Sequence, residues 1–187
     1  MPGLELILAL SELTDFSFCE ATASELQKDD RRWEVRRATP ELWEQLPLSR
    51  GLYMFVFVPP LELRIAQRPQ SRESFRYTLY VGKAGAGDSD GTFRSRYKSD
   101  YCQHVAQNPE RLWEPHSRSR ADLLAKYLNL YPLEYWFLEV AERDTISRLE
   151  TSLIKLLNPP LNIQGTIKMR PGKPGPAFVQ GGRPDGQ

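Results

Sequence analysis

The amino-acid sequence predicts an α/β fold of the α+β type, with strands and helices around one hydrophobic core. Three runs of aromatic and β-branched residues have the composition of strands, and they lie at 51–58, 76–81 and 133–141. Elsewhere apolar residues recur every three or four positions, which indicates amphipathic helices. The chain has 187 residues, of which 40% are hydrophobic, so it is long enough to bury a sizeable core.

The first 50 residues predict an N-terminal extension that packs on the core. Residues 1–38 mix short apolar runs with charged residues, and we expect strands and turns there. Thr39, Pro40 and Glu41 have the pattern of an N-cap, a first-turn proline and an acidic first turn, which predicts a short helix.

The domain that follows, 51–162, begins with two predicted strands separated by a polar stretch. Strand 51–58 stops at Pro59-Pro60, and residues 61–74 lead to the strand at 76–81. Residues 85–91 then contain three glycines and predict a flexible loop.

Three helices are predicted in the rest of this domain. From Thr92, apolar residues recur at i+4 spacing, at Phe93, Tyr97, Tyr101 and Val105. A further helix is expected at 118–130, before the strand at 133–141. Asp144 is predicted to cap a helix that runs to 157 and ends at Asn158-Pro159-Pro160.

The charge is unevenly distributed along a chain with a formal net charge of +1. Residues 1–50 carry a net charge of −4 and residues 51–187 a net charge of +5, so a polyanion would prefer the second part. The last 25 residues, 163–187, hold 4 prolines and 6 glycines, which predicts a flexible tail.

The sequence favours a cytoplasmic protein without a membrane partner. Two cysteines cannot form the framework of a disulfide-rich secreted domain, so we expect a reducing compartment. The apolar stretch 4–10 is too short to span a bilayer and contains Glu5. The two cysteines and two histidines also lack the spacing of a zinc site.

Two polar side chains on predicted helices are candidates for chemistry. Glu150 lies at the margin of an apolar stripe, where a carboxylate either reaches solvent or meets a cation. Arg96 precedes Asp100 by four residues, which suits a local ion pair on a solvated helix face. A guanidinium at that place is equally suited to bind a phosphate, and the residues alone leave both readings open.

Five elements in order resemble the GIY-YIG nuclease superfamily. They are Gly51-Leu52-Tyr53, Tyr80-Val81-Gly82-Lys83, an arginine in the next helix, a glutamate in a later helix, and Asn162 after Pro159-Pro160-Leu161. Residues 80–84 and 149–162 look much like the corresponding segments of the UvrC-type incision domain. The resemblance spans about residues 51–162.

The chain departs from the family pattern in several places. Leu52 and Val81 replace the usual isoleucines, and the connections before Tyr80 and after Lys83 are longer, as in some restriction enzymes of the superfamily. One helical turn after the arginine, where the family usually has His or Tyr, this chain has Asp100 followed by Tyr101. Either can take that position. Arg94 is the alternative to Arg96 for the arginine; Arg96 is preferred because Phe93 then takes the apolar position three residues before it.

The resemblance implies a central three-stranded antiparallel sheet flanked by helices, and a divalent-metal-dependent endonuclease that hydrolyses DNA in restriction, phage defence or repair. Glu150 would bind Mg²⁺ or Mn²⁺, since Mg²⁺ takes one or two carboxylates together with water and phosphate oxygens. The pattern does not separate DNA from RNA as the substrate. The alternative function is a non-catalytic nucleic-acid-binding module that has kept the fold and lost turnover.

The resemblance also implies roles for the other residues of the site. Tyr53 would activate water, and the ammonium of Lys83 would favour its phenolate. Arg96 would stabilise the charge that develops on the phosphoryl oxygens. Tyr80 would bind the phosphate or share the role of the base, and Asn162 would hold the site together by hydrogen bonds.

Overall fold

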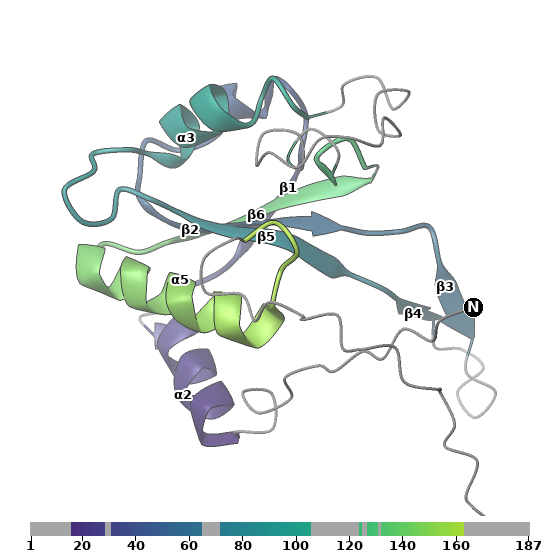
Figure 1. Ribbon diagram of the computed structural model, residues 1–187, viewed down its shortest axis with the longest axis horizontal. Helices are drawn as coiled ribbons and strands as arrows, with labels where there is room; N and C mark the ends of the chain where they lie inside the picture. Colours follow the sequence, from purple (N-terminus) through teal and green to yellow (C-terminus); the bar gives the residue numbers. More distant parts are fainter. Residues whose placement is uncertain are drawn as a thin grey trace, which may run out of the picture.

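The computed structural model of the chain describes residues 16–28, 31–64, 72–105, 124, 127–130 and 132–162. Its centre is a four-stranded antiparallel sheet with the strand order β1-β6-β2-β5 (Figure 1). The strands are β1 (Glu34–Arg37), β2 (Gly51–Phe57), β5 (Tyr77–Ala84) and β6 (Leu133–Glu139). Among the described strands, β5 is therefore an edge of the sheet, and β2 lies between β5 and β6.

Helices cover both faces of this sheet. One face carries α3 (Phe93–Asp100) and the short 3₁₀ helix η2 (Leu42–Glu44), and the other carries α5 (Arg143–Leu157) (Figure 1). The helix α2 (Phe16–Leu26) packs against the outer side of α5, where Glu25 accepts a hydrogen bond from Arg148 at 3.1 Å. The result is a layered α+β fold, as predicted for the fold class.

Alternation along the strands gives the sheet two separate hydrophobic cores. Under α3 the core is largely aromatic and includes Tyr53, Phe55, Phe93, Tyr97, Tyr101 and Tyr135. Under α5 it is aliphatic and includes Leu52, Val56, Val81, Leu138, Ile146, Leu149 and Leu153. Neighbouring residues of β2 therefore point to opposite faces, and so do those of β5 from Tyr80 to Ala84. A register shift between Phe55 and Val56 interrupts the alternation of β5, so that Leu79 and Tyr80 lie in the same core.

The expectation of a three-stranded sheet is not confirmed, because the described sheet has a fourth strand. β1 pairs with the outer side of β6, from Glu34 opposite Phe137 to Arg37 opposite Glu134. All four β1 residues are exposed, so backbone pairing rather than side-chain burial holds this strand in the sheet. The charged sequence Glu-Val-Arg-Arg gives no strand pattern of its own, and no helix was predicted where α2 lies.

The helix predicted after Thr39 is only the single 3₁₀ turn η2, and its N-cap is Glu41 rather than Thr39. The prediction that Asp144 caps the last helix is wrong, because the N-cap is Glu142, two residues earlier, and Asp144 lies in the first turn. The end of this helix agrees with the prediction, since Asn158 is left-handed at φ 41° and Pro159 follows.

The N-terminus of α3 is fixed by a reciprocal pair of hydrogen bonds. The Thr92 side chain accepts from the backbone N–H of Ser95, and the Ser95 side chain accepts from the N–H of Thr92. This capping box confirms the predicted start of the helix.

The polar stretch between the first two predicted strands contains a two-stranded ribbon. Its strands, β3 (Glu62–Arg64) and β4 (Arg72–Ser74), pair antiparallel with each other and form a second sheet. Figure 1 shows the ribbon at the end of the main sheet that is far from the loop after β5. Most of the predicted helix 118–130 and the whole of the predicted tail 163–187 lie outside the described residues. Among the described helices, none is long and apolar enough to cross a membrane.

Candidate active site

Tyr53 lies at the centre of the aromatic core, and its place depends on a glycine in the neighbouring strand. Tyr53 in β2 pairs in register with Gly82 in β5. A Cβ atom at Gly82 would lie 2.5 Å from Cζ of Tyr53 and 2.6 Å from its hydroxyl oxygen. Because Gly82 has no side chain, the tyrosine ring can lie across the edge strand with its hydroxyl beside it. The Tyr-x-Gly pattern of β5 thus has a steric reason.

Four tyrosine rings meet at this point. The ring of Tyr53 stacks on that of Tyr135 with centroids 5.4 Å apart, and it contacts Tyr80 at 6.2 Å and Tyr101 at 5.8 Å. The hydroxyl oxygens of Tyr53 and Tyr101 are 2.7 Å apart and share a hydrogen bond. Tyr101 is also hydrogen-bonded to Tyr80, so three of the hydroxyls form a connected chain.

This environment keeps Tyr53 protonated. Burial raises the pKa of Tyr53 above its ordinary value of 10.0, and the neighbouring Tyr80 acts in the same direction. The hydrogen bond from Tyr101 and the charge of Arg96 lower the pKa of Tyr53 but do not overcome burial. The cation that favours the phenolate is therefore Arg96. The expectation that Lys83 has this effect is not met, because its ammonium lies on the other face of the sheet.

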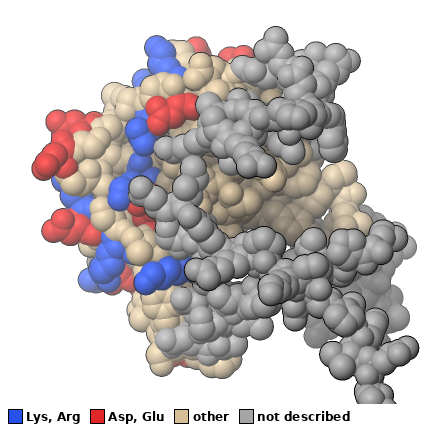
Figure 2. Space-filling model, in the orientation of Figure 1, with Lys and Arg blue, Asp and Glu red and all other residues tan. Residues whose placement is uncertain are grey.

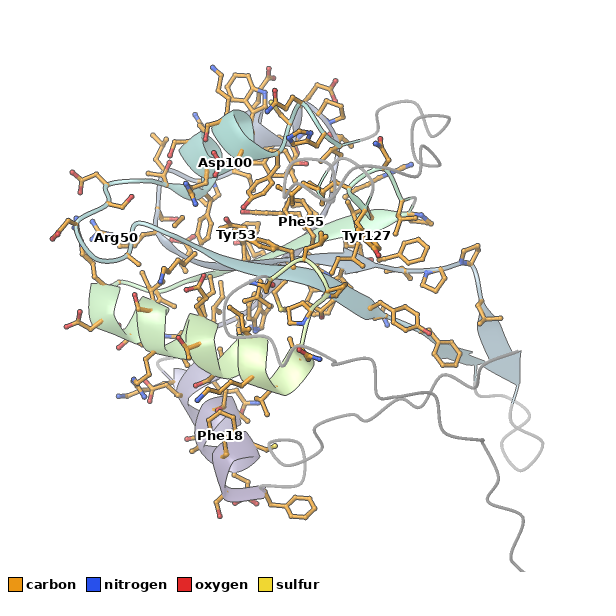
Figure 3. The ribbon with its side chains drawn as sticks, viewed as in Figure 1. Phe18, Arg50, Tyr53, Phe55, Asp100 and Tyr127 are labelled. Carbon is orange, nitrogen blue, oxygen red and sulfur yellow. The ribbon has the colours of Figure 1, made fainter. Side chains whose placement is uncertain are left out.

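Arg96 extends from α3 towards the tyrosine cluster and is half-buried. Partial burial lowers the pKa of its guanidinium, but Tyr53, Asp100 and Tyr101 outweigh burial and hold that pKa above its usual value. One nitrogen of Arg96 lies 3.0 Å from Oδ2 of Asp100, the local pair that i+4 spacing predicts. Figure 3 shows Asp100 on α3 above Tyr53. By contrast, Nε of Arg94 donates to the carbonyl of Leu46 at 2.9 Å, away from the tyrosine cluster.

The structure distinguishes Tyr101 from Asp100, which the sequence left open. α3 ends at Asp100, and Tyr101 is the C-cap with φ −128°. Its ring is completely buried and its hydroxyl meets Tyr53, whereas Asp100 remains at the surface beside Arg96. Tyr101 is thus a site residue that sequence reasoning did not assign. The sequence feature that points to Tyr101 is the stripe of Phe93, Tyr97 and Tyr101, which follows the buried face of the helix.

On the other face of the sheet, Lys83 and Glu150 form an ion pair. Nζ of Lys83 lies 2.7 Å from Oε2 of Glu150, and it donates to Oγ of Ser147 at 3.4 Å. The Glu150 side chain is 17% exposed and the Lys83 side chain 38% exposed, so solvent reaches the pair. Glu150 follows the buried Leu149 on α5, at the margin of the helix where the sequence placed it.

The tyrosine cluster and the Lys83–Glu150 ion pair are the two halves of the candidate site, and they meet at the outer edge of β5. Gly82, which faces Tyr53, is followed directly by Lys83, which faces α5, so the edge strand separates the tyrosine hydroxyls from the ion pair. Beside the earlier part of β5, the backbone N–H of Leu161 donates to the carbonyl of Leu79 at 3.0 Å. Figure 1 shows residues 161–162 passing in front of this strand.

Asn162 completes the pairing of this edge with its side chain. Its Oδ1 accepts from the N–H of Val81 at 2.9 Å, and its Nδ2 donates to the carbonyl of Val81 at 2.8 Å. A buried asparagine thus takes the place of a neighbouring strand for one residue. Asn162 therefore holds the edge strand at Val81, two residues before Lys83.

The loop after β5 borders the same region. Arg143, the first residue of α5, donates to the carbonyl of Gly87 and to Oδ1 of Asp90, at 2.6 Å in each case. On the face shown in Figure 2, Lys and Arg side chains form a band from α3 past the end of the sheet to α5, with Asp and Glu among them. The surface that borders the site therefore has mixed charge, with a cationic band across it.

Two surface hollows lie elsewhere. One of about 530 Å³ includes Arg31 and Arg50, and one of about 490 Å³ includes Tyr77 and Leu157; neither is lined by Tyr53 or Glu150.

The described residues contain no group of three or more His, Cys, Asp or Glu side chains that could hold a metal ion. Metal binding within this part of the chain would use the single carboxylate of Glu150 together with water and substrate oxygens, which is a donor set that suits Mg²⁺. Comparison of the chain with family models, curated proteins and solved structures found no match. The functional conclusion therefore depends on the chemistry of these residues.

Proposed function

We propose that the protein is a divalent-metal-dependent endonuclease that hydrolyses phosphodiester bonds in DNA. The observation that carries this proposal is that two chemically different groups of side chains meet at the edge strand β5. On one face of the sheet, the cation of Arg96 lies beside the hydrogen-bonded Tyr53 and Tyr101. On the other face lies the carboxylate of Glu150, which solvent reaches. Phosphodiester hydrolysis needs a cation, because negative charge develops on the phosphate. It also needs a carboxylate, because the metal that activates water must be held.

Glu150 is the residue that would hold Mg²⁺ or Mn²⁺. The bound metal would polarise a phosphoryl oxygen and lower the pKa of a coordinated water. Lys83 now neutralises this carboxylate at 2.7 Å, which keeps the half-buried charge paired when no metal is present. With substrate bound, the Lys83 ammonium would contact a phosphate oxygen instead.

Arg96 supplies a fixed positive charge to the phosphate. Its guanidinium is charged at every accessible pH, as arginine is in proteins, and the surrounding groups raise its pKa further. Removing a donor of this kind typically costs two to three orders of magnitude in rate, about 2.7–4 kcal/mol. Asp100 pairs with Arg96 at 3.0 Å and orients it in the absence of substrate.

Tyr53 is the group proposed to accept the proton of the attacking water. The water oxygen forms a bond to phosphorus, the bond from phosphorus to the leaving nucleoside oxygen breaks, and the phenolate of Tyr53 takes the proton. Burial raises the pKa of Tyr53, so its phenolate must form as substrate binds, favoured by Arg96. Tyr101 and Tyr80 hold the hydroxyl in place through the hydrogen-bonded chain and give the proton a path to the surface.

Two observations favour the second candidate, a nucleic-acid-binding module without turnover. The raised pKa of Tyr53 and the closed pair of Lys83 with Glu150 both describe a resting protein without an ionised base or a free carboxylate. Such a surface would bind a phosphate backbone through Lys83 and Arg96 alone.

The two candidates are separated by incubating the purified chain with supercoiled plasmid and with single-stranded DNA, in Mg²⁺, in Mn²⁺ and in EDTA. The nuclease converts supercoiled plasmid to nicked or linear forms in either metal and leaves it intact in EDTA. A protein that retards the plasmid on a gel in all three conditions and never cuts it is the binding module.

A further inference from the structure

The strand β1 forms one edge of the main sheet within the described part of the chain. β6 pairs with its inner side, and no described strand pairs with its outer side. All four residues of β1 are exposed. A strand edge of this kind presents backbone N–H and C=O groups with which a further strand can pair.

The register with β6 shows which backbone groups of β1 point outward. The N–H of Ala38 donates to the carbonyl of Leu133 at 2.9 Å, and the pairing of β1 with β6 continues from there without a shift. In an antiparallel pair, every second residue bonds to the opposite strand. The backbone groups of Val35 and Arg37 therefore point away from β6. The carbonyl of Val35 accepts from Nη1 of Arg36 at 3.1 Å on this exposed side.

Two copies of β1 can pair antiparallel about a two-fold axis. Residues directly opposite each other in an antiparallel pair lie on the same face of the sheet, so the axis must pass through a residue. An axis at Val35 places the outward backbone groups of Val35 opposite the same groups of the second copy. It also places Glu34 opposite Arg36 of the second copy, and this ion pair occurs twice.

The charges of β1 favour this register over the other. An axis at Arg36 would place Arg36 opposite Arg36 of the second copy, and like charges directly opposite destabilise two strands, whereas opposite charges stabilise them. Oε2 of Glu34 lies 2.8 Å from Nη2 of Arg36 in the same chain, so both side chains lie on one face. They are 48% and 49% exposed, which leaves them accessible to a second copy.

We propose that the chain forms a two-fold homodimer through β1, in which two four-stranded sheets join into one continuous antiparallel sheet. The partner is a second copy because β1 is complementary to itself in the antiparallel direction, with Val35 at the centre and opposite charges on either side. The candidate active site lies at β5, the opposite edge of the described sheet. The inference therefore does not depend on the proposed function.

The test measures the dissociation constant of the dimer of the full-length chain by analytical ultracentrifugation over a range of concentrations. Glu34→Arg leaves two arginines on this face of β1, and Arg36→Glu leaves two glutamates. Each variant alone places like charges opposite each other twice, so we expect the dissociation constant to rise at least about tenfold. An equimolar mixture of the two variants restores both opposite-charge pairs, and it should form a heterodimer about as tight as the parent homodimer.

Val35→Pro tests the backbone pairing separately from the charges. Proline removes an N–H that points away from β6, a change that an edge strand tolerates, so the chain should fold and remain monomeric. Val35→Thr keeps the N–H and the branched side chain, and this matched control should dimerise like the parent.

Circular dichroism and thermal melting establish that each of these chains folds. A chain that carries Glu34→Arg and Arg36→Glu together restores the charge pairs in reversed order, and it should dimerise like the parent. This double variant provides the test of the register if a single variant fails to fold.

A parent chain that stays monomeric at the highest concentration reached would overturn the inference. So would a folded Val35→Pro chain that dimerises as tightly as the parent, because the dimer would then use another surface. A mixture of the two charge variants that dimerises no better than each variant alone, or a folded double variant that stays monomeric, would show that Glu34 and Arg36 do not face each other. Each of these results would leave the nuclease proposal standing.

Discussion

Tyr53 and Tyr135 have stacked rings in one buried cluster, but their hydroxyls differ. The Tyr53 hydroxyl is hydrogen-bonded to Tyr101, whereas no group in the described part of the chain bonds to the Tyr135 hydroxyl. This pair offers a matched test, because each Tyr→Phe change removes one oxygen from the same cluster. We expect Tyr53→Phe to lower the cleavage rate at least about a hundredfold, the scale of a lost general base.

Tyr135→Phe should leave the cleavage rate close to that of the parent. Since it removes a buried hydroxyl without a described partner, it should also leave the free energy of unfolding unchanged or slightly raised. Single-turnover cleavage and urea unfolding measure the two effects. Equal losses of rate in both variants would mean that the cluster acts only as core and that Tyr53 has no chemical role.

Arg96 and Arg94 provide the second comparison at this scale. They lie two residues apart on α3, but Arg96 acts on Tyr53, whereas Arg94 is bonded to the carbonyl of Leu46. We predict that Arg96→Ala lowers single-turnover cleavage at least about a hundredfold. Arg94→Ala should mainly lower the melting temperature, because it leaves the Leu46 carbonyl without this donor. The reverse pattern of rates would assign the phosphate contact to Arg94.

At the scale of elements, the edge strand β5 connects the two halves of the site, and Asn162 supports it. Two hydrogen bonds of the Asn162 side chain are to the backbone of Val81, two residues before Lys83. Asn162→Ala leaves the buried N–H and C=O of Val81 without partners, at about 1–3 kcal/mol for each group. We expect a lower free energy of unfolding, faster hydrogen exchange at the Val81 amide and reduced cleavage.

The decisive readout for Asn162 is exchange in the native protein. If Asn162→Ala lowers cleavage while the Val81 amide exchanges as slowly as in the parent, then Asn162 contacts substrate directly and does not act through the strand. Asn162→Asp keeps the acceptor for the Val81 N–H and loses the donor, so it should have an intermediate effect on exchange.

Elements with a strong hydrophobic pattern could be predicted from the sequence, and elements held by partners could not. β2 and β6 have aromatic and branched residues that are buried over most of their length, and α5 has a clear apolar stripe. β1 has no buried residue, and α2 buries only Thr22 among its described side chains, so neither has a local signal. They form because β6 and α5 offer surfaces to pair with or pack against.

The candidate site, too, could be predicted from the sequence only in part. Order along the chain suggested Tyr53, Arg96 and Glu150, but it did not show that they lie on two faces of one sheet. The i+4 rule paired Arg96 with Asp100, as observed, but the sequence left open whether Asp100 or Tyr101 lies beside Tyr53. α3 ends at Asp100, and Tyr101 turns into the core. Likewise, only the alternation of β5 shows that Lys83 meets Glu150 and not Tyr53.

For the whole molecule, the tyrosine core predicts loss of stability at alkaline pH. Burial is the largest cause that raises the pKa of Tyr53, Tyr97, Tyr101 and Tyr135 in the folded chain. In the unfolded chain these phenols ionise near pH 10. The folded state therefore binds more protons above pH 10, and stability is present in full below that pH and lost as pH rises beyond it.

We expect the free energy of unfolding to fall from about pH 10 upward, by up to about 1.4 kcal/mol per pH unit for each of these tyrosines. Urea unfolding at a series of pH values measures it, and tyrosinate absorbance should appear together with unfolding. Tyr135→Phe should reduce the slope of the free energy of unfolding against pH by the contribution of one tyrosine. Ionisation of all the tyrosines near pH 10 in a chain that stays folded would contradict the description of this core.

The central claim is that one edge of the sheet carries a metal-dependent nuclease site with Glu150 as its carboxylate. It is tested most directly by plasmid nicking in Mg²⁺ with the Glu150→Gln chain. Glu142→Gln is the matched control, since Glu142 is the N-cap of the same helix and its exposed carboxylate pairs with Arg31. We predict that both variants fold, that Glu142→Gln nicks at the parent rate and that Glu150→Gln nicks no faster than the parent chain in EDTA. Nicking by Glu150→Gln at the parent rate would contradict the claim.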